Sequence, residues 1–449
     1  MNLDLAGKRV LVLGLGISGR SAARFCAGLG AEVVAADERG SEALGDIDDV
    51  EAVATLALGG ALPDAAGFDL VVPSPGVPAS RYRGSARCVW GDIELAWRAL
   101  SVPIVAVTGT NGKSTTTRLI EALLRAAGLR AEAAGNIGSS ALDLVGRPLD
   151  VAVLEVSSFQ LETTQGFCPK VALILNITPD HLDRHGSFEA YVAAKARLFA
   201  NQGPGDWAVV NADDPVVLGE ARRARSRKLP FRVTGEPLPS GDGAFFEEGL
   251  AQFRLDGRLE TLFRRDEVVL PGAHLAGDLL VAAAAARLLG APAEAIARAV
   301  RAFRGVEHVL EHVATIGGVA YYNDSKATNV EAARRSLEAF VQPVLIVLGG
   351  RYKGGDFGEL APELRTHGRR VLAIGEARER VGEALGDAVP VDPCSSLREA
   401  VERAHAAARP GDVVLLAPAC SSFDMFADYA DRGRAFKAEV VRLVEAARG

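Results

Sequence analysis

A short glycine-rich segment, VAVTGTNGKST at residues 105–115, has the residue types of a phosphate-binding loop. Its glycines let backbone N–H groups turn toward one anion, and the helix predicted to follow adds the positive end of its dipole. The loop is two residues shorter than the common G-x-x-x-x-G-K-[ST] pattern, so the strand-loop-helix context carries the interpretation. We expect a nucleoside triphosphate with Mg²⁺, bound by Gly109, Thr110, Asn111, Gly112, Lys113, Ser114 and Thr115.

Hard oxygen ligands follow two apolar, strand-like runs in the central part of the chain. Glu155 follows VAVL, and Asp180 and His181 follow VALILNI. A carboxylate at the end of a buried strand is costly unless a partner such as Mg²⁺ compensates its charge. We expect Glu155 and His181 to bind metal at the sheet edge that carries the phosphate loop. An ion pair for Glu155 and a hydrogen-bonded loop position for His181 are the simpler alternatives.

The first segment carries a second glycine-rich turn. Gly14, Gly16 and Gly19 in GLGISG follow the run VLVL, and Asp37 closes the next run, VVAAD. This spacing fits the dinucleotide fingerprint, in which a helix N-terminus holds a diphosphate and a carboxylate holds a ribose. Those contacts do not select the base, so a uridine diphosphate satisfies them as well as NAD. Ser74 in VVPSPGVP opens another tight loop at a strand end, for which a plain turn is an equal alternative.

Lysine is scarce in this chain. Only 8 of the 50 basic residues are lysine and the other 42 are arginine. Where such a composition keeps an ammonium, the site can require a compact charge or a nucleophilic amine, which makes Lys113, Lys195, Lys326 and Lys353 candidates. Lys195 lies in a predicted helix, and the residues alone favour a solvated surface lysine there. Beside a metal ion its amine would instead be available to form a carbamate with CO₂.

Length, composition and charge narrow the class of protein. A chain of 449 residues is too long for one compact core and indicates about three domains. The net charge of −7 argues against a nucleic-acid binder. No apolar run approaches the roughly 20 residues that cross a bilayer, and the N-terminus lacks a signal-peptide core. Five scattered cysteines without metal-ligand spacing are typical of reduced thiols, and we expect a cytoplasmic protein that binds no membrane.

Apolar runs alternate with amphipathic stretches along the chain, which predicts an α/β fold with parallel sheets covered by helices. Residues 231–270 break this alternation and indicate a small antiparallel addition. Domain boundaries are expected near 91–103 and 304–307, giving domains 1–92, 93–305 and 306–449. The clearest predicted strands are 10–13, 151–156, 171–177, 344–348, 371–374 and 413–417.

Eight motifs together resemble the Mur ligases of peptidoglycan synthesis, and the resemblance covers nearly the whole chain. NDSKATN and the serine-rich PACSS segment favour the member of that family that adds D-glutamate. In order, the motifs are GLGISG, TGTNGKST, GNIG (135–138), LEVSSFQLE (154–162), DHLDRHG (180–186), NDSKATN (323–329), LGGRYKGGDF (348–357) and PACSSFDMF (418–426).

The resemblance implies a monomeric enzyme with a Rossmann-like UDP-binding domain, a central P-loop ATPase domain and a Rossmann-like C-terminal domain for the incoming amino acid. The alanyl carboxylate of UDP-N-acetylmuramoyl-L-alanine would attack the γ-phosphate of ATP, and the amine of D-glutamate would then attack the acyl phosphate. Such a reaction needs cations at converging phosphates and carboxylates, and closure against water.

The resemblance also implies roles for individual residues. Lys113 would contact the β- and γ-phosphates, Ser114 and Glu155 would hold one Mg²⁺, and His181 with N-carbamylated Lys195 would hold another. The remaining implied residues are Asp278, Asp324 and Lys326 for ATP; Leu15, Ser18, Asp37 and Ser74 for the UDP end; Asn136, Ser157 and Gln160 for the rest of the UDP-sugar; and Thr328, Lys353, Ser422 and Tyr429 for D-glutamate.

Two motifs depart from the family pattern. Family members commonly show G-x-H-N-x-x-N where this chain has Gly272, His274, Leu275 and Asp278, and H-R where it has His308 and Val309. We expect weaker ATP binding or a looser base preference, because an amide and an arginine are lost.

Three other functions compete with this interpretation. A folylpolyglutamate synthase-like ligase shares the phosphate loop and the carbamylated lysine but lacks the first domain. A regulatory module that hydrolyses ATP slowly would not need so many separate polar motifs. An NAD dehydrogenase is indicated by GLGISG alone.

Overall fold

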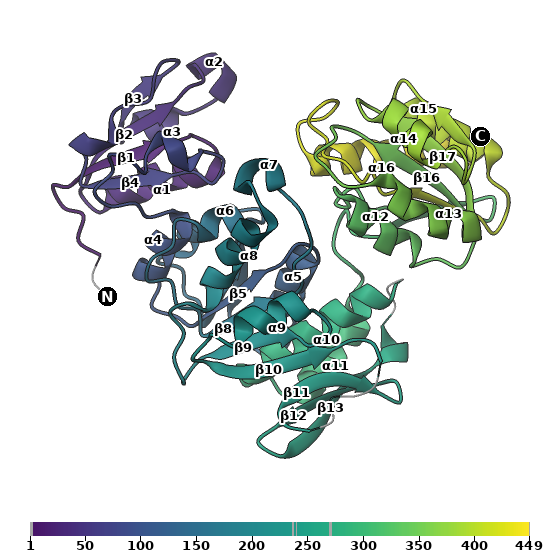
Figure 1. Cartoon of the computed structure of the whole chain (residues 1–449), viewed down its shortest axis with the longest axis horizontal. Coiled ribbons are helices and arrows are strands. Elements are labelled where there is room, and N and C mark those ends of the chain that lie inside the picture. Colours follow the sequence, from purple (N-terminus) through teal and green to yellow (C-terminus); the bar gives the residue numbers. More distant parts are fainter. Residues whose placement is uncertain (1–2, 236–237, 239, 269–271, 449) are drawn as a thin grey trace. The chain divides into compact units, whose positions relative to one another are not determined.

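The computed structural model describes residues 3–235, 238, 240–268 and 272–448. These residues form three sheets, each built from strands that are consecutive in the chain (Figure 1). Two compact units contain them. Met1–Ile177, Glu189–Arg264 and Leu280–Ala299 make the first unit, which holds two sheets, and Thr178–Phe188, Arg265–Leu279 and Val300–Gly449 make the second.

The first sheet is wholly parallel, with the order β3-β2-β1-β4. Strand β1 is a buried apolar run that pairs with β2 on one side and β4 on the other. The loop after β1 therefore lies beside the carboxyl ends of both neighbours. The elements are β1 (Arg9–Leu13), α1 (Ile17–Gly28), β2 (Glu32–Asp37), α2 (Ser41–Leu44), α3 (Asp48–Glu51), β3 (Thr55–Leu58), η1 (Ala65–Gly67), β4 (Leu70–Pro73) and η2 (Ala79–Arg81).

Helix α4 (Asp92–Ala99) leads into the nine-stranded central sheet, whose order is β13-β12-β11-β10-β9-β8-β5-β7-β6. The strand order reverses at β5, which places the ligand-binding edge at the carboxyl ends of β5, β7 and β8. Its parallel part consists of β5 (Ile104–Thr108), α5 (Lys113–Ala126), β6 (Ala131–Gly135), η3 (Ala141–Leu144), β7 (Val151–Glu155), α6 (Ser158–Leu161), β8 (Val171–Ile174), α8 (Phe188–Ala196), η4 (Arg197–Phe199), β9 (Trp207–Asn211), α9 (Pro215–Ala221) and β10 (Arg227–Arg232).

The expected antiparallel addition is present. Strands β11 (Gly243–Glu247), β12 (Leu250–Leu255) and β13 (Arg258–Arg264) pair antiparallel with one another and extend the sheet from β10. Helices α10 (Ala273–Leu288) and α11 (Ala293–Ala302) follow.

The strand predicted over 171–177 ends earlier, at Ile174. Residue 177 has left the ladder, because the Ile177 N–H donates to the Asp214 carboxylate (2.8 Å).

The second unit contains a six-stranded sheet with the order β14-β15-β19-β16-β17-β18, in which only the β14–β15 pair is antiparallel. Helices cover both faces, since Ile346 and Leu348 belong to one apolar cluster and Leu345 and Val347 to another. The elements are α7 (Leu182–His185), η5 (Arg265–Glu267), β14 (Glu311–Ile316), β15 (Val319–Asn323), α12 (Val330–Leu337), β16 (Val344–Gly349), η6 (Phe357–Leu360), α13 (Ala361–His367), β17 (Gly368–Ile374), α14 (Arg378–Leu385), β18 (Val391–Pro393), α15 (Leu397–Ala407), β19 (Val413–Leu416) and α16 (Tyr429–Arg448).

The α/β fold class is therefore confirmed. The exact domain bounds stay a prediction. Within the described ranges, no helix has both the length and the apolar character needed to cross a membrane.

Candidate active site

The glycine-rich turn of the first sheet is held by the two loops beside it. Gly14 has a φ of +82°, and a Cβ on Gly19 would lie 1.8 Å from the Gly14 carbonyl oxygen, so both positions require glycine. The Leu15 N–H donates to Asp37 Oδ2 (2.8 Å), and Ser74 Oγ donates to the Gly14 carbonyl (2.6 Å). Ser74 thus buttresses the turn, while its contact with the UDP end of a substrate stays a prediction.

The Asp37 carboxylate also binds Arg39, a residue that sequence analysis did not single out. Arg39 Nε and Nη2 donate to the two carboxylate oxygens at 3.0 and 2.8 Å. This hydrogen bonding is the main cause that lowers the pKa of Asp37 to about 2. Asp37 therefore stays ionised, and its proximity in sequence to Arg39 was the signal that could have found the pair.

The phosphate loop between β5 and α5 adopts conformations that depend on glycine. Gly109 and Gly112 have φ values of +157° and +83°, and Gly112 is the N-cap of α5. Lys113 Nζ donates to the carbonyls of Gly109 (2.9 Å) and Thr110 (2.8 Å). The ammonium thus lies over the loop, next to the backbone N–H groups at the start of the helix, which is the arrangement that binds an anion.

Asn176, which follows β8, fixes the shape of this loop. Its side chain accepts from the Asn111 N–H (2.9 Å) and donates to the Asn111 carbonyl (3.1 Å), and its own carbonyl accepts from Thr110 N (2.9 Å). Sequence analysis missed Asn176. Its place at the end of a strand beside β5 was the available signal.

Glu155 and Ser114 meet at the carboxyl ends of β5 and β7. Ser114 Oγ donates to Glu155 Oε2, and Asn136 Nδ2 donates to Oε1 (2.7 Å). Glu155 is only 2% exposed, and no described arginine or lysine forms an ion pair with it, so the ion-pair alternative is wrong. A buried carboxylate beside a hydroxyl is a donor set that suits Mg²⁺.

Lys195 is buried. The prediction of a solvated surface lysine, which the residues alone favoured, is therefore wrong. It is 1% exposed, and its Nζ donates to the Gly109 carbonyl (2.8 Å), the same oxygen that Lys113 contacts. The Tyr191 ring lies 4.7 Å from the ammonium. Helix α8 therefore directs its lysine at the phosphate loop.

His181 lies in the second unit, at the start of α7. Its backbone has a φ of +54°, and its N–H donates to Asp180 Oδ1 (3.0 Å). The same oxygen lies 3.7 Å from Lys353 Nζ. Because His181 and Lys195 belong to different units, their pairing around a metal ion stays a prediction.

The loops after β15, β16 and β19 lie at neighbouring carboxyl ends in the second unit, and they carry predicted site residues. Lys326 Nζ donates to the Tyr429 hydroxyl (3.2 Å), and Thr328 N donates to the Lys326 carbonyl (2.8 Å). The buried Ser422 follows Ser421, whose backbone pairs in both directions with Arg351 (3.0 and 3.1 Å). One sheet edge thus gathers cationic and hydroxyl groups.

The comparisons with known proteins agree with this geometry. Residues 107–286 match the Mur ligase middle domain, and residues 310–420 match the Mur ligase glutamate ligase domain. Two proteins named UDP-N-acetylmuramoylalanine–D-glutamate ligase are similar over almost their whole length. The one from Acidobacterium capsulatum is 48% identical, covering 97% of this chain and 96% of that protein. The one from Pelotomaculum thermopropionicum is 44% identical, covering 98% and 99%. The chain belongs to the Mur ligase family.

Solved structures of Mur ligases and a pseudomurein ligase share the fold at low identity. A pseudomurein peptide ligase type C from Methanothermus fervidus has a TM-score of 0.62 at 18% identity, covering 97% of this chain and all of that one (100%). The MurF ligase from Thermotoga maritima, solved in complex with ADP, has a TM-score of 0.61 at 18% identity, covering 92% and 95%. Mur ligases are ATP-dependent enzymes of peptidoglycan precursor synthesis, so the expected family, the ligase activity and ATP are confirmed.

A buried arginine links two loops in the second unit of this Mur ligase. Arg432 is 1% exposed and donates to Ser325 Oγ (2.9 Å), the Ser325 carbonyl (2.9 Å) and the Cys420 carbonyl (3.1 Å). Burial lowers the pKa of Arg432 to about 10. Its guanidinium joins the loop after β15 to the loop after β19. Sequence analysis missed it, because arginine is abundant throughout the chain.

The departures from the Mur ligase pattern are accommodated by apolar packing. Leu275 is buried in the second unit's core, and Val309 packs against the same cluster. The side chain of His274 lies outside the described residues. Asp278 is half-buried in α10, and its predicted contact with ATP stays a prediction.

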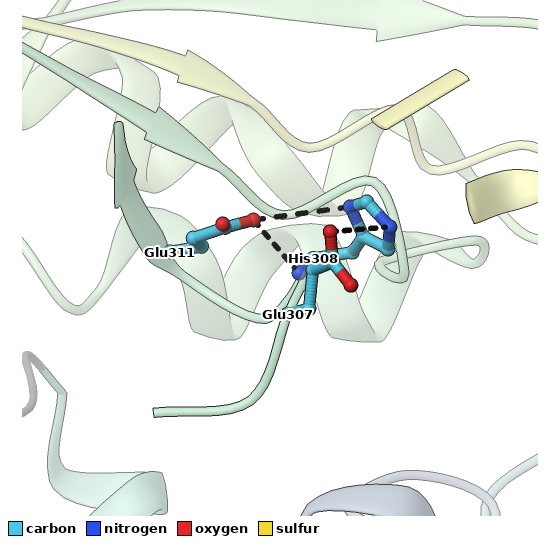
Figure 2. Close-up of side chains that lie close together, drawn as sticks. All are labelled: Glu307, His308 and Glu311. Atoms are coloured by element: carbon cyan, nitrogen blue, oxygen red, sulfur yellow. Dashed lines mark hydrogen bonds and ion pairs between the residues drawn. The ribbon is translucent and has the colours of Figure 1, made fainter. Parts of the chain in front are cut away.

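Glu307, His308 and Glu311 lie close together, and Figure 2 shows both carboxylates facing the histidine. Lys437 Nζ binds both Glu307 (2.6 Å) and Glu311 (3.0 Å), so one ammonium partly offsets the charge of the two carboxylates. His308 is buried, which lowers the pKa of its imidazole. Its carbonyl accepts from Lys326 N (3.2 Å). The cluster therefore anchors the Lys326 loop.

Asp324, in the same loop, is 6% exposed. Burial raises its pKa to about 6, while a hydrogen bond from Ser336 Oγ acts in the opposite direction.

Proposed function

We propose that this Mur ligase joins D-glutamate to UDP-N-acetylmuramoyl-L-alanine and converts ATP to ADP and phosphate. The observation that carries the proposal is the pairing of Ser114 with the buried Glu155, which no described lysine or arginine contacts in an ion pair, beside the phosphate loop. The identity of 48% over almost the whole chain to a ligase of that name supports the choice of substrates.

The chain's own groups suit phosphoryl transfer to a carboxylate. The amides of the phosphate loop and the Lys113 ammonium would hold the β- and γ-phosphates, and Ser114 with Glu155 would hold Mg²⁺. A Mg²⁺ ion at that place supplies charge neutralisation between the phosphates and the attacking carboxylate. A carbamate on Lys195, with His181, would offer a second site for Mg²⁺.

The reaction would then proceed in two chemical steps. A carboxylate oxygen of the L-alanyl group forms a bond to the γ-phosphorus, and the bond to ADP breaks. The D-glutamate amine attacks the acyl carbon, and phosphate leaves with that carboxylate oxygen while the amine loses a proton. The product is an amide extended by one residue.

Different residues of the two units would bind the different substrates. Leu15, Ser18, Asp37 and Ser74 would contact the UDP end, and Asn136, Ser157 and Gln160 the rest of that substrate. Thr328, Lys353, Ser422 and Tyr429 would bind D-glutamate, with Lys353 opposite its side-chain carboxylate, and Lys326, Asp324 and Asp278 would serve ATP. We further propose that the protein acts as a monomer in the cytoplasm.

Phosphate release tests the proposal. Purified protein receives Mg²⁺-ATP and UDP-N-acetylmuramoyl-L-alanine with D-glutamate, L-glutamate or no amino acid. The proposal predicts phosphate and a matching amide product with D-glutamate only. Equal phosphate release in all three reactions, without an amide, would favour a nucleotide-hydrolysing regulatory module instead.

A further inference from the structure

Asp92 is a buried carboxylate at the start of α4, where sequence analysis expected only a boundary between domains. It is 2% exposed, and no described lysine or arginine forms an ion pair with it. Its Oδ2 accepts from Ser18 Oγ (2.8 Å) and from Gln160 Nε2 (3.0 Å), while Oδ1 accepts from the Ile93 N–H (2.9 Å). One carboxylate oxygen therefore joins the glycine-rich turn of the first sheet to α6 of the central sheet.

The hydrogen bonds continue from Gln160 to Ser157. Gln160 Oε1 accepts from both the backbone N–H (3.0 Å) and the hydroxyl (3.2 Å) of Ser157. The carboxamide of Gln160 is thus fixed at both ends, and one N–H of its Nε2 stays available to a ligand. Three residues expected to contact the UDP-sugar substrate, Ser18, Ser157 and Gln160, belong to one network with Asp92 between them.

This network determines what Ser18 can offer to a ligand. The hydroxyl proton of Ser18 is directed to Asp92, so toward a ligand the side chain presents an acceptor oxygen. Only the backbone N–H of Ser18, at the N-terminus of α1, can then donate a hydrogen bond from this residue to a phosphate.

Helix α4 is built to hold Asp92 in place. Glu94, two residues further along the helix, is 0% exposed and accepts hydrogen bonds from the backbone N–H groups of Gln165 (2.9 Å), Gly166 (3.0 Å) and Phe167 (3.0 Å). Arg98 neutralises it from the same helix (2.7 Å). The hydrogen bonds to Glu94 therefore tie the segment that follows α6 to α4, and the bond from Gln160 to Asp92 ties α6 itself to the same helix.

We propose that Asp92 is a positioning residue for the UDP-sugar substrate, aligning the glycine-rich turn with Gln160 so that the two parts of the first unit bind one ligand together. This inference rests on the proposed function, because the substrate is the one named there. The hydrogen bonds of Asp92 go to Ser18, Gln160 and Ile93 and none goes to the phosphate loop, where ATP would bind, so we expect a change at Asp92 to affect the UDP-sugar substrate and not ATP.

The test compares Asp92→Ala, Asp92→Asn and a matched control in the full-length protein. Ser21→Ala is the control, because Ser21 Oγ makes an equivalent hydrogen bond from α1 to Asp143 (2.7 Å), outside the hydrogen bonds that join Ser18, Asp92 and Gln160. We would measure the KM for each substrate, kcat, the unfolding temperature, and the Kd of UDP-N-acetylmuramoyl-L-alanine by calorimetry.

Asp92→Ala is expected to raise the KM and Kd for UDP-N-acetylmuramoyl-L-alanine by about 10- to 100-fold, the equivalent of one or two hydrogen bonds to a charged group. The KM for ATP should change less than about twofold. Asp92→Asn keeps an oxygen that accepts from both donors, so its values should lie between those of Ala and wild type. Ser21→Ala should resemble wild type.

Equal effects of Asp92→Ala and Ser21→Ala, or an equal rise in the KM for ATP, would overturn the inference. If Asp92→Ala does not fold, an Asp92→Asn variant with unchanged KM and Kd would overturn it as well. The wild-type reaction separates this failure from a failure of the proposed function. A wild type that neither binds UDP-N-acetylmuramoyl-L-alanine nor turns over with D-glutamate would remove both.

Discussion

Replacing the buried Arg432 with methionine should separate stability from activity. Methionine has a similar length but removes the guanidinium that joins Ser325 to Cys420. The fall in the pKa of Arg432 from 12.5 to about 10 corresponds to about 3 kcal/mol of unfavourable burial of the charge, which the substitution relieves. Two buried carbonyls lose their donor, at about 1 to 3 kcal/mol each.

The two contributions nearly cancel. We expect a net loss in the free energy of unfolding of roughly 0 to 3 kcal/mol, which lowers the unfolding temperature by about 10 °C at most. The loops that carry Lys326, Thr328 and Ser422 would no longer be fixed relative to each other, so the KM for D-glutamate should rise at least about tenfold. The KM for UDP-N-acetylmuramoyl-L-alanine should not change, because its predicted contacts lie in the first unit.

Steady-state kinetics with each substrate varied, together with thermal unfolding, measure both effects. Arg434→Met is the matched control, since Arg434 lies in the same helix with a side chain 59% exposed and pairs only loosely with Asp431 (3.4 Å). A folded Arg432→Met variant with a wild-type KM for D-glutamate would refute the reasoning. So would a loss of stability much larger than that estimate.

Three further predictions concern the nucleotide site and its surroundings. Ser114→Ala removes the hydroxyl beside Glu155, so the Mg²⁺ concentration for half-maximal phosphate release should rise about tenfold or more; an unchanged Mg²⁺ titration would contradict the metal assignment. Because the folded-state pKa of Asp324 (about 6) exceeds the ordinary 3.8, its protonated form is favoured on folding. The carboxyl therefore costs stability as pH rises from about 4 to 6, by about 3 kcal/mol, and Asp324→Asn should remove that part of the pH dependence of unfolding; identical pH profiles for the two proteins would be the contrary result. Leu275 and Val309 replace an amide and an arginine of the family pattern, so calorimetry should find weak ATP binding with little preference over GTP; a submicromolar Kd with strong adenine selectivity would show that other groups replace the lost ones.

Much of the site was predictable because it follows strand ends. An apolar run that ends in a glycine or a carboxylate gives both the strand and the edge at which its polar residue lies. Gly14, Asp37 and Ser74 were placed together in this way, and so were Ser114 and Glu155.

Residues whose roles depend on burial were not predictable. Lys195 lies among alanines in α8, so the sequence does not indicate which face of that helix is buried. Arg432 is one of 42 arginines, and nothing in its neighbourhood distinguishes it from the exposed Arg434. Asp92 opens a helix at an expected domain boundary, and its two long-range partners lie 74 and 68 residues away. Contacts of that kind arise only when the sheets are assembled.

The most direct test of the central claim follows the oxygen atoms of the substrate carboxylate. UDP-N-acetylmuramoyl-L-alanine labelled with ¹⁸O in its alanyl carboxylate would be turned over with ATP and D-glutamate, and the phosphate analysed by mass spectrometry. Transfer of the carboxylate oxygen to phosphate, with one labelled oxygen for each amide formed, is the result that an acyl phosphate predicts. Unlabelled phosphate would show that ATP is hydrolysed by water and would contradict the ligase mechanism.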